Sequence, residues 1–183
     1  MNEMKSRVPG PRSLVHPGPL NPVRIKSMHC ERGRHVRLSL SPGLSLYDAL
    51  VAPLARAGIE NASTTLLGGH LESVDYCVAP PDPSGTAVAA YTKPIHADNA
   101  YLVFGNATLG KDASGEAVVH CHAAIMTGNG EVRGGHILPH SCIIGRHPIV
   151  ALVTSLDGFE LRVTYDAETN LSFFLPTGEL AHA

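Results

Sequence analysis

The feature that most constrains this chain is an alternating run over residues 117–125, followed by a glycine-rich segment. Alternation predicts a strand, and because successive side chains of a strand leave opposite faces, His120 and His122 share one face. The Gly-Asn-Gly sequence of residues 128–130 predicts a turn, after which His136 returns on the neighbouring strand. The sequence therefore predicts an antiparallel hairpin with three histidines.

The length of the turn decides whether these histidines meet. A three-residue loop of residues 128–130 places His122 directly opposite His136. A two-residue loop would instead place Ala123 there, on the wrong face of the strand. A bulge at Gly134-Gly135 is another way to bring the histidines together. We expect the three-residue loop or the bulge.

Three imidazoles on one sheet face, without a fourth protein ligand in the motif, are typical of a metal site with an open coordination position. We expect His120, His122 and His136 to bind a divalent metal. Zinc suits tetrahedral imidazole ligation best, although imidazole also accepts iron or nickel. The ion could polarise a carbonyl or carboxylate, or acidify a bound water. The alternative is a polar sheet face that happens to be rich in histidine.

A working enzyme would also need an acid or base near the metal. Candidates are His70 and Glu72 after an expected Gly-Gly turn, and His96 or Asp98 in an expected loop. Arg133 is a candidate clamp for a carboxylate. For each of them, a solvated surface position is the alternative. The ligand expected is a small anion with a carbonyl or carboxylate group, and an enzyme of this kind would be a metal-dependent lyase or hydrolase.

The length of 183 residues suits one domain with a real core, and the 18 Gly and 14 Pro with many Val, Thr and Ile indicate a strand-rich fold. Ser45 with Asp48 three positions later predicts the start of one helix, which Gly58 ends. Pro53 is expected to kink or divide it. Strands are expected at residues 36–40, 61–67, 72–79, 86–92, 101–109, 117–126, 131–138, 149–156, 158–166 and 170–175, with loops at residues 80–85 and 93–99.

Prolines crowd the first 22 residues, which predicts an extended arm over residues 1–33 before a domain of residues 34–183. Residues 1–37 hold eight of the 14 Lys and Arg and two acidic residues, a net charge of +6 against −8 for the remainder. A basic arm could contact nucleic acid. Because the arm lacks interleaved aromatic residues, contact with an acidic body, its own or a neighbour's, is favoured.

The four cysteines show no Cys-x-x-Cys spacing and lie mostly in apolar strand patterns. We therefore expect buried free thiols in a reducing compartment, with a cytoplasmic location. No apolar run approaches the length of a membrane span, and no signal segment opens the chain, so no membrane contact is expected. The cysteines are Cys30, Cys77, Cys121 and Cys142.

Several segments together resemble the PPC family, also called DUF296, a domain shared by plants and prokaryotes. The resemblance covers roughly residues 35–175 and keeps the family's order of motifs. Its most specific part is His-x-His followed by a hairpin and Gly-Gly-His. The matching segments are Arg37-Leu38, residues 40–43, residues 46–55, Gly58-Ile59, residues 66–69, Gly105, residues 120–122, residues 130–138 and residues 159–166.

The resemblance implies an α+β fold with a central, mostly antiparallel and strongly curved sheet, one or two helices, and a homotrimer. For function, the resemblance implies assembly with other proteins, which the domain mediates in plants, where it accompanies AT-hooks. It also implies DNA binding, a label that prokaryotic members carry by association with the plant proteins. This chain has Arg32-Gly33-Arg34 but lacks a true AT-hook, and it carries an insertion around residues 80–99. The related acetolactate decarboxylases hold zinc with a His-x-His pair and a third histidine. The second hypothesis is a non-catalytic assembly or DNA-binding module, whose trimer surface recruits other proteins or nucleic acid and whose metal only fastens the assembly.

Overall fold

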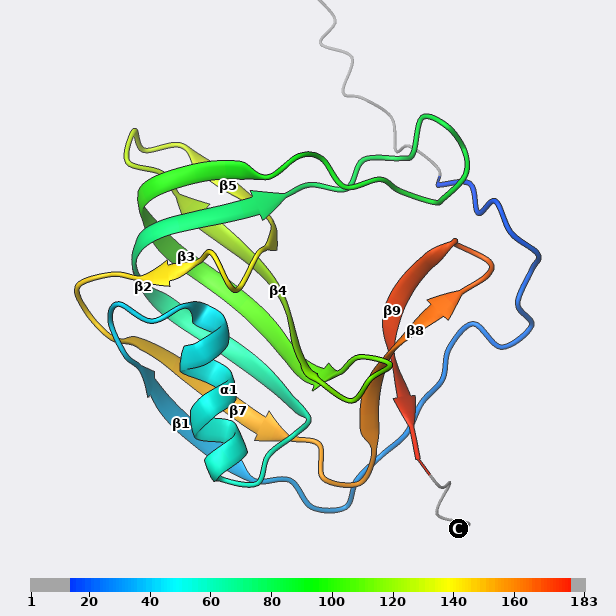
Figure 1. The fold of residues 1–183 in the computed structure, drawn as a ribbon, viewed down its shortest axis with the longest axis horizontal. Helices are drawn as coiled ribbons and strands as arrows, with labels where there is room; N and C mark the ends of the chain where they lie inside the picture. The colour runs from blue at the N-terminus through cyan, green and yellow to red at the C-terminus, as the bar shows by residue number, and fades with distance from the viewer. Residues whose placement is uncertain (1–13, 179–183) are drawn as a thin grey trace, which may run out of the picture.

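The computed structural model describes residues 14–178 as a curved mixed sheet with one helix, α1 (Leu46–Arg56) (Figure 1). The expected fold class is confirmed. Within these residues, no helix is long and apolar enough to cross a membrane. The strands are β1 (His35–Leu40), β2 (Ala62–Cys77), β3 (Ile95–Lys111), β4 (Ala117–Met126), β5 (Val132–Ile137), β6 (Ile143–Ile144), β7 (Ile149–Ser155), β8 (Glu160–Asp166) and β9 (Leu171–Thr177).

Strand β2 organises the sheet, whose strand order is β1-β7-β2-β5-β4-β3-β8-β9 with β6 also paired to β2. One edge of β2 pairs with β3 along most of its length, and on the other edge Cys77 pairs with His136 of β5. Because β3 pairs with β4 and β4 pairs with β5, these four strands close into a ring. The hairpin of β4 and β5 is therefore held on both sides by β2 and β3.

The helix begins where the sequence predicts. The Ser45 hydroxyl accepts a hydrogen bond from the Asp48 backbone N–H at 3.0 Å and donates one to the Asp48 carboxylate at 2.7 Å. Pro53 lies inside the helix, which nevertheless continues to Arg56, so of the two expected effects, a kink or a division, the division does not occur. Leu50 and Leu54 are buried on either side of Pro53, and this packing holds the helix together across the missing hydrogen bond.

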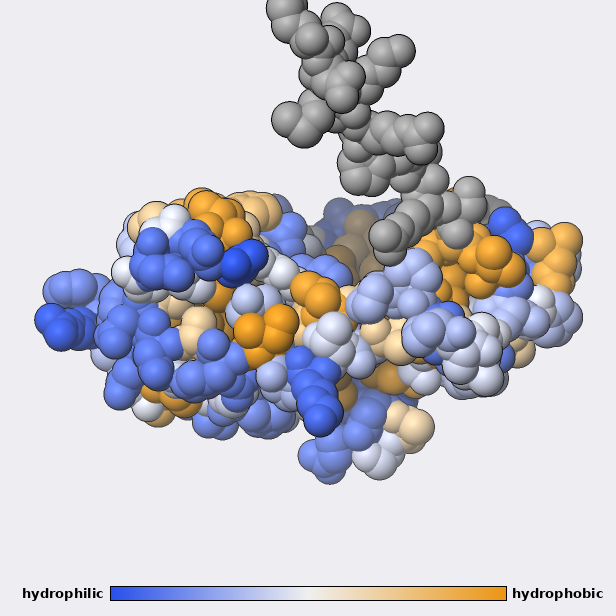
Figure 2. Space-filling view, turned by 90° about the horizontal axis from the view of Figure 1, so that it is seen from above, coloured by the Kyte–Doolittle hydropathy of each residue, from blue (hydrophilic) through white to orange (hydrophobic). Residues whose placement is uncertain are grey.

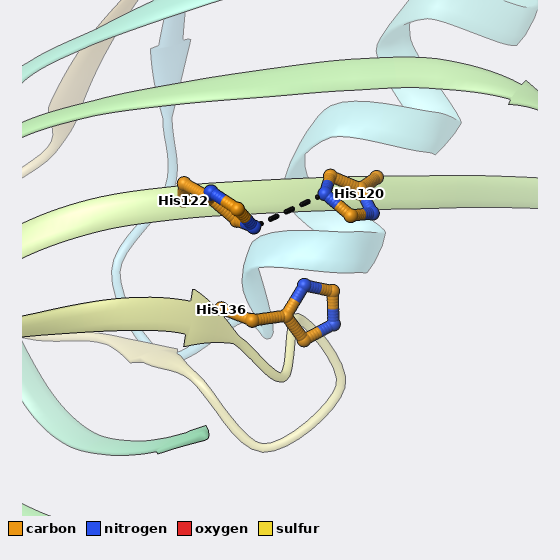
Figure 3. Close-up of side chains that lie close together, drawn as sticks. All are labelled: His120, His122 and His136. Atoms are coloured by element: carbon orange, nitrogen blue, oxygen red, sulfur yellow. Dashed lines mark hydrogen bonds between the residues drawn. The ribbon is translucent and has the colours of Figure 1, made fainter. Parts of the chain in front are cut away.

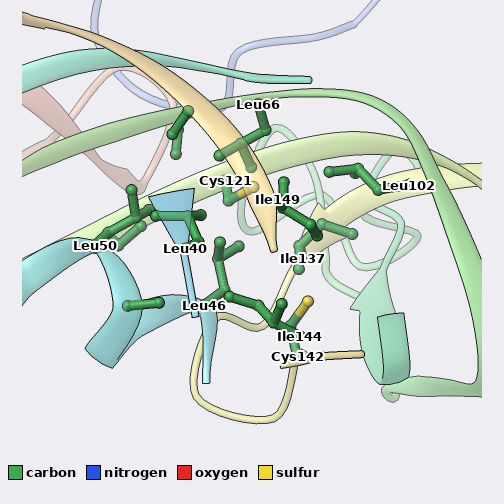
Figure 4. Close-up of a cluster of buried hydrophobic side chains, with 14 of the residues drawn as sticks. Leu40, Leu46, Leu50, Leu66, Leu102, Cys121, Ile137, Cys142, Ile144 and Ile149 are labelled. Atoms are coloured by element: carbon green, nitrogen blue, oxygen red, sulfur yellow. The ribbon is translucent and has the colours of Figure 1, made fainter. Parts of the chain in front are cut away.

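The core lies between α1 and the sheet (Figure 4). Helix side chains such as Leu50 meet strand side chains such as Leu66, and Cys121 of β4 is fully buried among them. Burial of Cys121 turns its neighbours on β4 to the outer face of the sheet. Among the described residues the cysteines are free thiols, with Cys30 partly exposed and the other three buried, as predicted except at Cys30.

Two sequence predictions about strands are wrong. The expected strands over residues 61–67 and 72–79 form one strand, β2, with no turn at Gly68-Gly69. Glycine serves close packing here, because a Cβ on Gly69 would lie 2.6 Å from the Ile149 side chain. The expected strand over residues 86–92 is a loop with a single bridge to Ala89, whereas β3 already begins at Ile95, inside an expected loop.

Candidate metal centre

The turn between β4 and β5 has the predicted length. The Thr127 N–H donates to the Glu131 carbonyl at 2.9 Å, which closes a loop of residues 128–130. Gly130 has a φ of 82°, a backbone conformation that favours glycine. His122 pairs directly with His136, and the register runs without a bulge from one end of β5 to the other. The three-residue loop is confirmed, and the bulge is not needed.

The three histidines form one cluster on the face of β4 turned away from α1 (Figure 3). One possible ligand atom from each of His120, His122 and His136 can be chosen so that all lie within 4.8 Å of one another. The two Nε2 atoms of His120 and His122 are 3.2 Å apart. The ring centroids of His120 and His136 are 4.7 Å apart, and those of His122 and His136 are 5.6 Å apart. Cross-strand pairing therefore produces a convergent trio.

The surroundings favour the neutral form of two of these imidazoles, His120 and His136. Burial, with smaller contributions from the neighbouring His136 and His122, lowers the pKa of His120 to about 4. Burial also lowers the pKa of His136, with a smaller contribution from His122. Neutral imidazole is the form that binds metal. His136 Nδ1 is buried and has no hydrogen-bond partner among the described residues, so a donor atom of the cluster is left unpaired.

Two aromatic rings flank the cluster from other parts of the chain. Tyr91, in the loop between β2 and β3, lies with its ring centroid 5.1 Å from that of His136. Phe174 of β9 lies edge-on to His120, with centroids 6.4 Å apart. On a third side, a shallow depression of about 290 Å³ lies beside His122, and Phe104 and Asn106 line it. The cluster is therefore accessible next to His122 and walled by aromatic rings elsewhere.

The other candidate residues do not belong to this cluster. His96 is bound by Asp75 at 2.6 Å and Asp98 at 3.1 Å, which raise its pKa. Arg133 pairs with Glu131 at 2.6 Å and, three positions from His136, lies on the opposite face of β5.

His70 and Glu72, the candidates expected after a Gly-Gly turn, do not belong to the histidine cluster either. His70 and Glu72 lie within β2 rather than after a turn, and the ring of His70 packs against Gly145. His70 Nδ1 is buried without a hydrogen-bond partner in the described part of the chain. Sequence reasoning did not single out Tyr91 or Phe174, because only tertiary folding brings these distant aromatic residues to the histidines.

The described residues thus define a class of protein: a small curved-sheet domain with a three-histidine cluster on its outer face. The model of the Plants and Prokaryotes Conserved (PCC) domain matches residues 28–156. The chain therefore belongs to this family, which is the PPC family of the resemblance above. No curated protein matches the chain.

Solved structures share the fold at low sequence identity. A Pyrococcus horikoshii plant- and prokaryote-conserved (PPC) protein is 17% identical, with a TM-score of 0.58 over 84% of this chain and 99% of its own. An Archaeoglobus fulgidus protein described as metal-containing is 17% identical, with a TM-score of 0.61 over 83% and 99%. A Ralstonia eutropha protein described as a candidate DNA-binding protein is 17% identical, with a TM-score of 0.61 over 85% and 99%.

Proposed function

We propose that His120, His122 and His136 bind one divalent metal ion, zinc, and leave a coordination position open for a small carbonyl- or carboxylate-containing ligand. The observation that carries the proposal is the convergence of three imidazoles within 4.8 Å. Three nitrogens about 2.1 Å from a tetrahedral ion lie about 3.4 Å apart. The 3.2 Å between His120 and His122 already matches this spacing, and small side-chain rotations would bring the third nitrogen in.

The unpaired Nδ1 of His136 gives independent support. A buried imidazole nitrogen without a partner costs free energy, and coordination by an ion would remove that cost. The structure of an Archaeoglobus fulgidus protein with the same fold is described as metal-containing, which agrees with the proposal. A bound ion would supply Lewis acidity towards a ligand oxygen, while Tyr91 and Phe174 would limit the access of water from two sides.

Titration of the chelated, metal-free protein with Zn²⁺ tests the proposal. Wild type should bind one zinc per chain. His136→Ala should weaken binding by on the order of 100-fold, since each ligand carries a substantial share of the binding free energy of a zinc site. The exposed His147, outside the cluster, provides the matched control, and His147→Ala should bind like wild type. Equal zinc affinity in wild type and His136→Ala would contradict the proposal.

The second candidate is a non-catalytic assembly module, and an exposed apolar surface favours it. Tyr101, Met126 and Val132 lie side by side across β3, β4 and β5, and each is more than 40% exposed. Phe104, 51% exposed, continues this surface towards His122. Elsewhere, hydrophobic residues gather in several places among hydrophilic ones (Figure 2). Contiguous exposed apolar side chains on one sheet face are typical of interaction sites.

We propose a second copy of this chain as the partner of that surface, in the homotrimer that the family resemblance implies. None of these four residues is charged. Two copies of this acidic domain can therefore meet at this surface without bringing charges of the same sign together. His122→Ala separates the two functions. Loss of trimer mass together with a lower melting temperature would assign the metal a structural role, whereas loss of ligand binding alone would support the first candidate.

The free thiols support a cytoplasmic location as part of the same proposal. Nucleic-acid binding is not part of it, because Arg24 of the basic arm and Arg34 at the start of the domain already pair with Glu168 and Asp157 of the same chain.

A further inference from the structure

The N-terminal arm is fastened to the body at one buried carboxylate, Glu168, in the turn between β8 and β9. Glu168 is only 4% exposed. Its carboxylate accepts from the Asn21 N–H at 2.7 Å and from the Arg24 guanidinium at 2.5 Å, and it pairs with His16 Nδ1 at 2.7 Å. Charge-assisted hydrogen bonds to a carboxylate are the stronger kind, and a buried carboxylate left unpaired is costly. The arm therefore completes the environment of Glu168.

Gly18 brings the arm against the backbone of the same turn. Its N–H donates to the Glu168 carbonyl at 2.9 Å. A Cβ on Gly18 would lie 1.7 Å from the carbonyl oxygen of Ala167, so no other residue fits there without moving the arm. Four arm positions thus meet this turn, and the arm passes outside the β8–β9 hairpin (Figure 1).

The same turn also holds the loop between β2 and β3. The Val88 N–H donates to the Thr169 carbonyl at 2.9 Å, and the Asn170 side-chain amide donates to the Thr86 carbonyl at 2.8 Å. Figure 1 shows this loop, in green, reaching from the sheet across to the hairpin. The turn between β8 and β9 is therefore a junction of three segments that are far apart in the sequence.

The loop and the β8–β9 hairpin, which meet at this junction, each place an aromatic ring beside the histidine cluster. The loop places Tyr91 against His136, and β9 places Phe174 beside His120. We propose that the N-terminal arm is a clamp that holds these two aromatic walls in place and so controls exchange of the ion and ligand at the three-histidine site. Its effect on exchange rests on the proposed metal site, but its effect on the loop does not. The arm residues that contact the turn, and the hairpin itself, lie outside residues 28–156, which the family model matches.

Hydrogen exchange of the full-length, zinc-free protein tests the clamp directly. Glu168→Gln removes the negative charge, and Gly18→Val displaces the arm by a different route; neither residue belongs to the buried apolar core. Both variants should increase exchange of the amides at positions 18 and 21 and, about tenfold, of the Val88 amide in the loop, each compared with the intrinsic rate of the residue present. The control is Glu160→Gln, a carboxylate of the same hairpin that pairs with Lys111 and Arg162 instead of the arm. It should leave all three amides as in wild type.

Release of Zn²⁺ into excess chelator measures the consequence at the histidines. Glu168→Gln and Gly18→Val should release zinc about tenfold faster than wild type and Glu160→Gln. The clamp is overturned if the Gly18 and Asn21 amides lose protection while Val88 does not, or if none of the three responds. If zinc release is unchanged although the Val88 amide exchanges faster, the arm does not control exchange of the ion at the three-histidine site. If wild type binds no zinc, the proposed function fails, and the Val88 result still decides whether the arm holds the loop.

Discussion

Because burial lowers the pKa of His120 to about 4, the metal-free protein should lose stability on mild acidification. In the unfolded chain the same imidazole titrates near its ordinary value of 6.5. Between these values the unfolded state binds a proton that the native state does not bind, so the free energy of unfolding falls as the pH falls. The contribution of His120 is therefore fully present above pH 6.5 and is lost progressively towards pH 4.

The size of the effect follows from the two pKa values. Acidification from pH 7 to pH 5 would remove about 1.8 kcal/mol through a fully buried group. His120 is only partly buried, and screening by solvent reduces the expected loss to about 1 kcal/mol. Urea unfolding in the presence of chelator, at pH 7, 6 and 5, measures it. Gln cannot take up the proton, so His120→Gln should lose about 1 kcal/mol less than wild type over this range.

The comparison between variants isolates His120 from the other titrating groups. Asp75 and Asp98 raise the pKa of His96, which stabilises the protein at low pH and loses this effect as pH rises. The two opposite effects overlap in wild type, but His96 is unchanged in the variant. His147→Gln, at an exposed position outside the cluster, should keep the wild-type pH dependence. An equal loss of stability in wild type and His120→Gln would refute the reasoning.

Three further outcomes are expected. Ser45→Ala removes the acceptor of the Asp48 N–H and should cost about 1 kcal/mol in urea unfolding; no change would mean that the cap is unimportant. Gly69→Ala places a Cβ 2.6 Å from the Ile149 side chain and should lower the free energy of unfolding by about 1–3 kcal/mol. Gly128→Ala, whose Cβ would meet nothing nearer than 3.9 Å, should change it by less than about 0.5 kcal/mol. Equal losses in the two variants would contradict close packing at Gly69. Burial raises the pKa of the Cys121 and Cys142 thiols to about 12. Iodoacetamide at pH 8 should therefore modify Cys30 in the native protein and leave these two intact, which mass spectrometry of the peptides measures. Rapid labelling of Cys121 or Cys142 would contradict their burial.

The hairpin that carries the histidines could be predicted because its determinants are local. Alternation places His120 and His122 on one face, and the length of the turn sets the partner of His136. The cap at Ser45 is equally local, since donor and acceptor lie three residues apart. The expected division at Pro53 did not occur because buried leucines from the core hold the helix on either side. In that case, tertiary packing outweighs the local preference.

Long-range contacts account for what the sequence alone did not reveal. Gly68-Gly69 has the composition of a turn, but its role is to let β2 pass close to Ile149 and Tyr101, which are distant in the chain. The loop that carries Tyr91 has strand-like residues, yet its Val88 N–H donates to Thr169 in the β8–β9 turn rather than to a neighbouring strand. The closure of the sheet into a ring also depends on pairing between Cys77 and His136, which no local pattern encodes.

The most direct measurement of the central claim is X-ray diffraction from crystals of the protein grown with zinc, recorded on both sides of the zinc absorption edge. One anomalous peak is expected about 2.1 Å from a nitrogen of each of His120, His122 and His136, with a water or a small anion at the remaining position. In crystals of His136→Ala grown at the same limiting zinc concentration, the peak should be much weaker. A zinc peak elsewhere, or three histidines that stay hydrogen-bonded to one another in saturating zinc, would contradict the account.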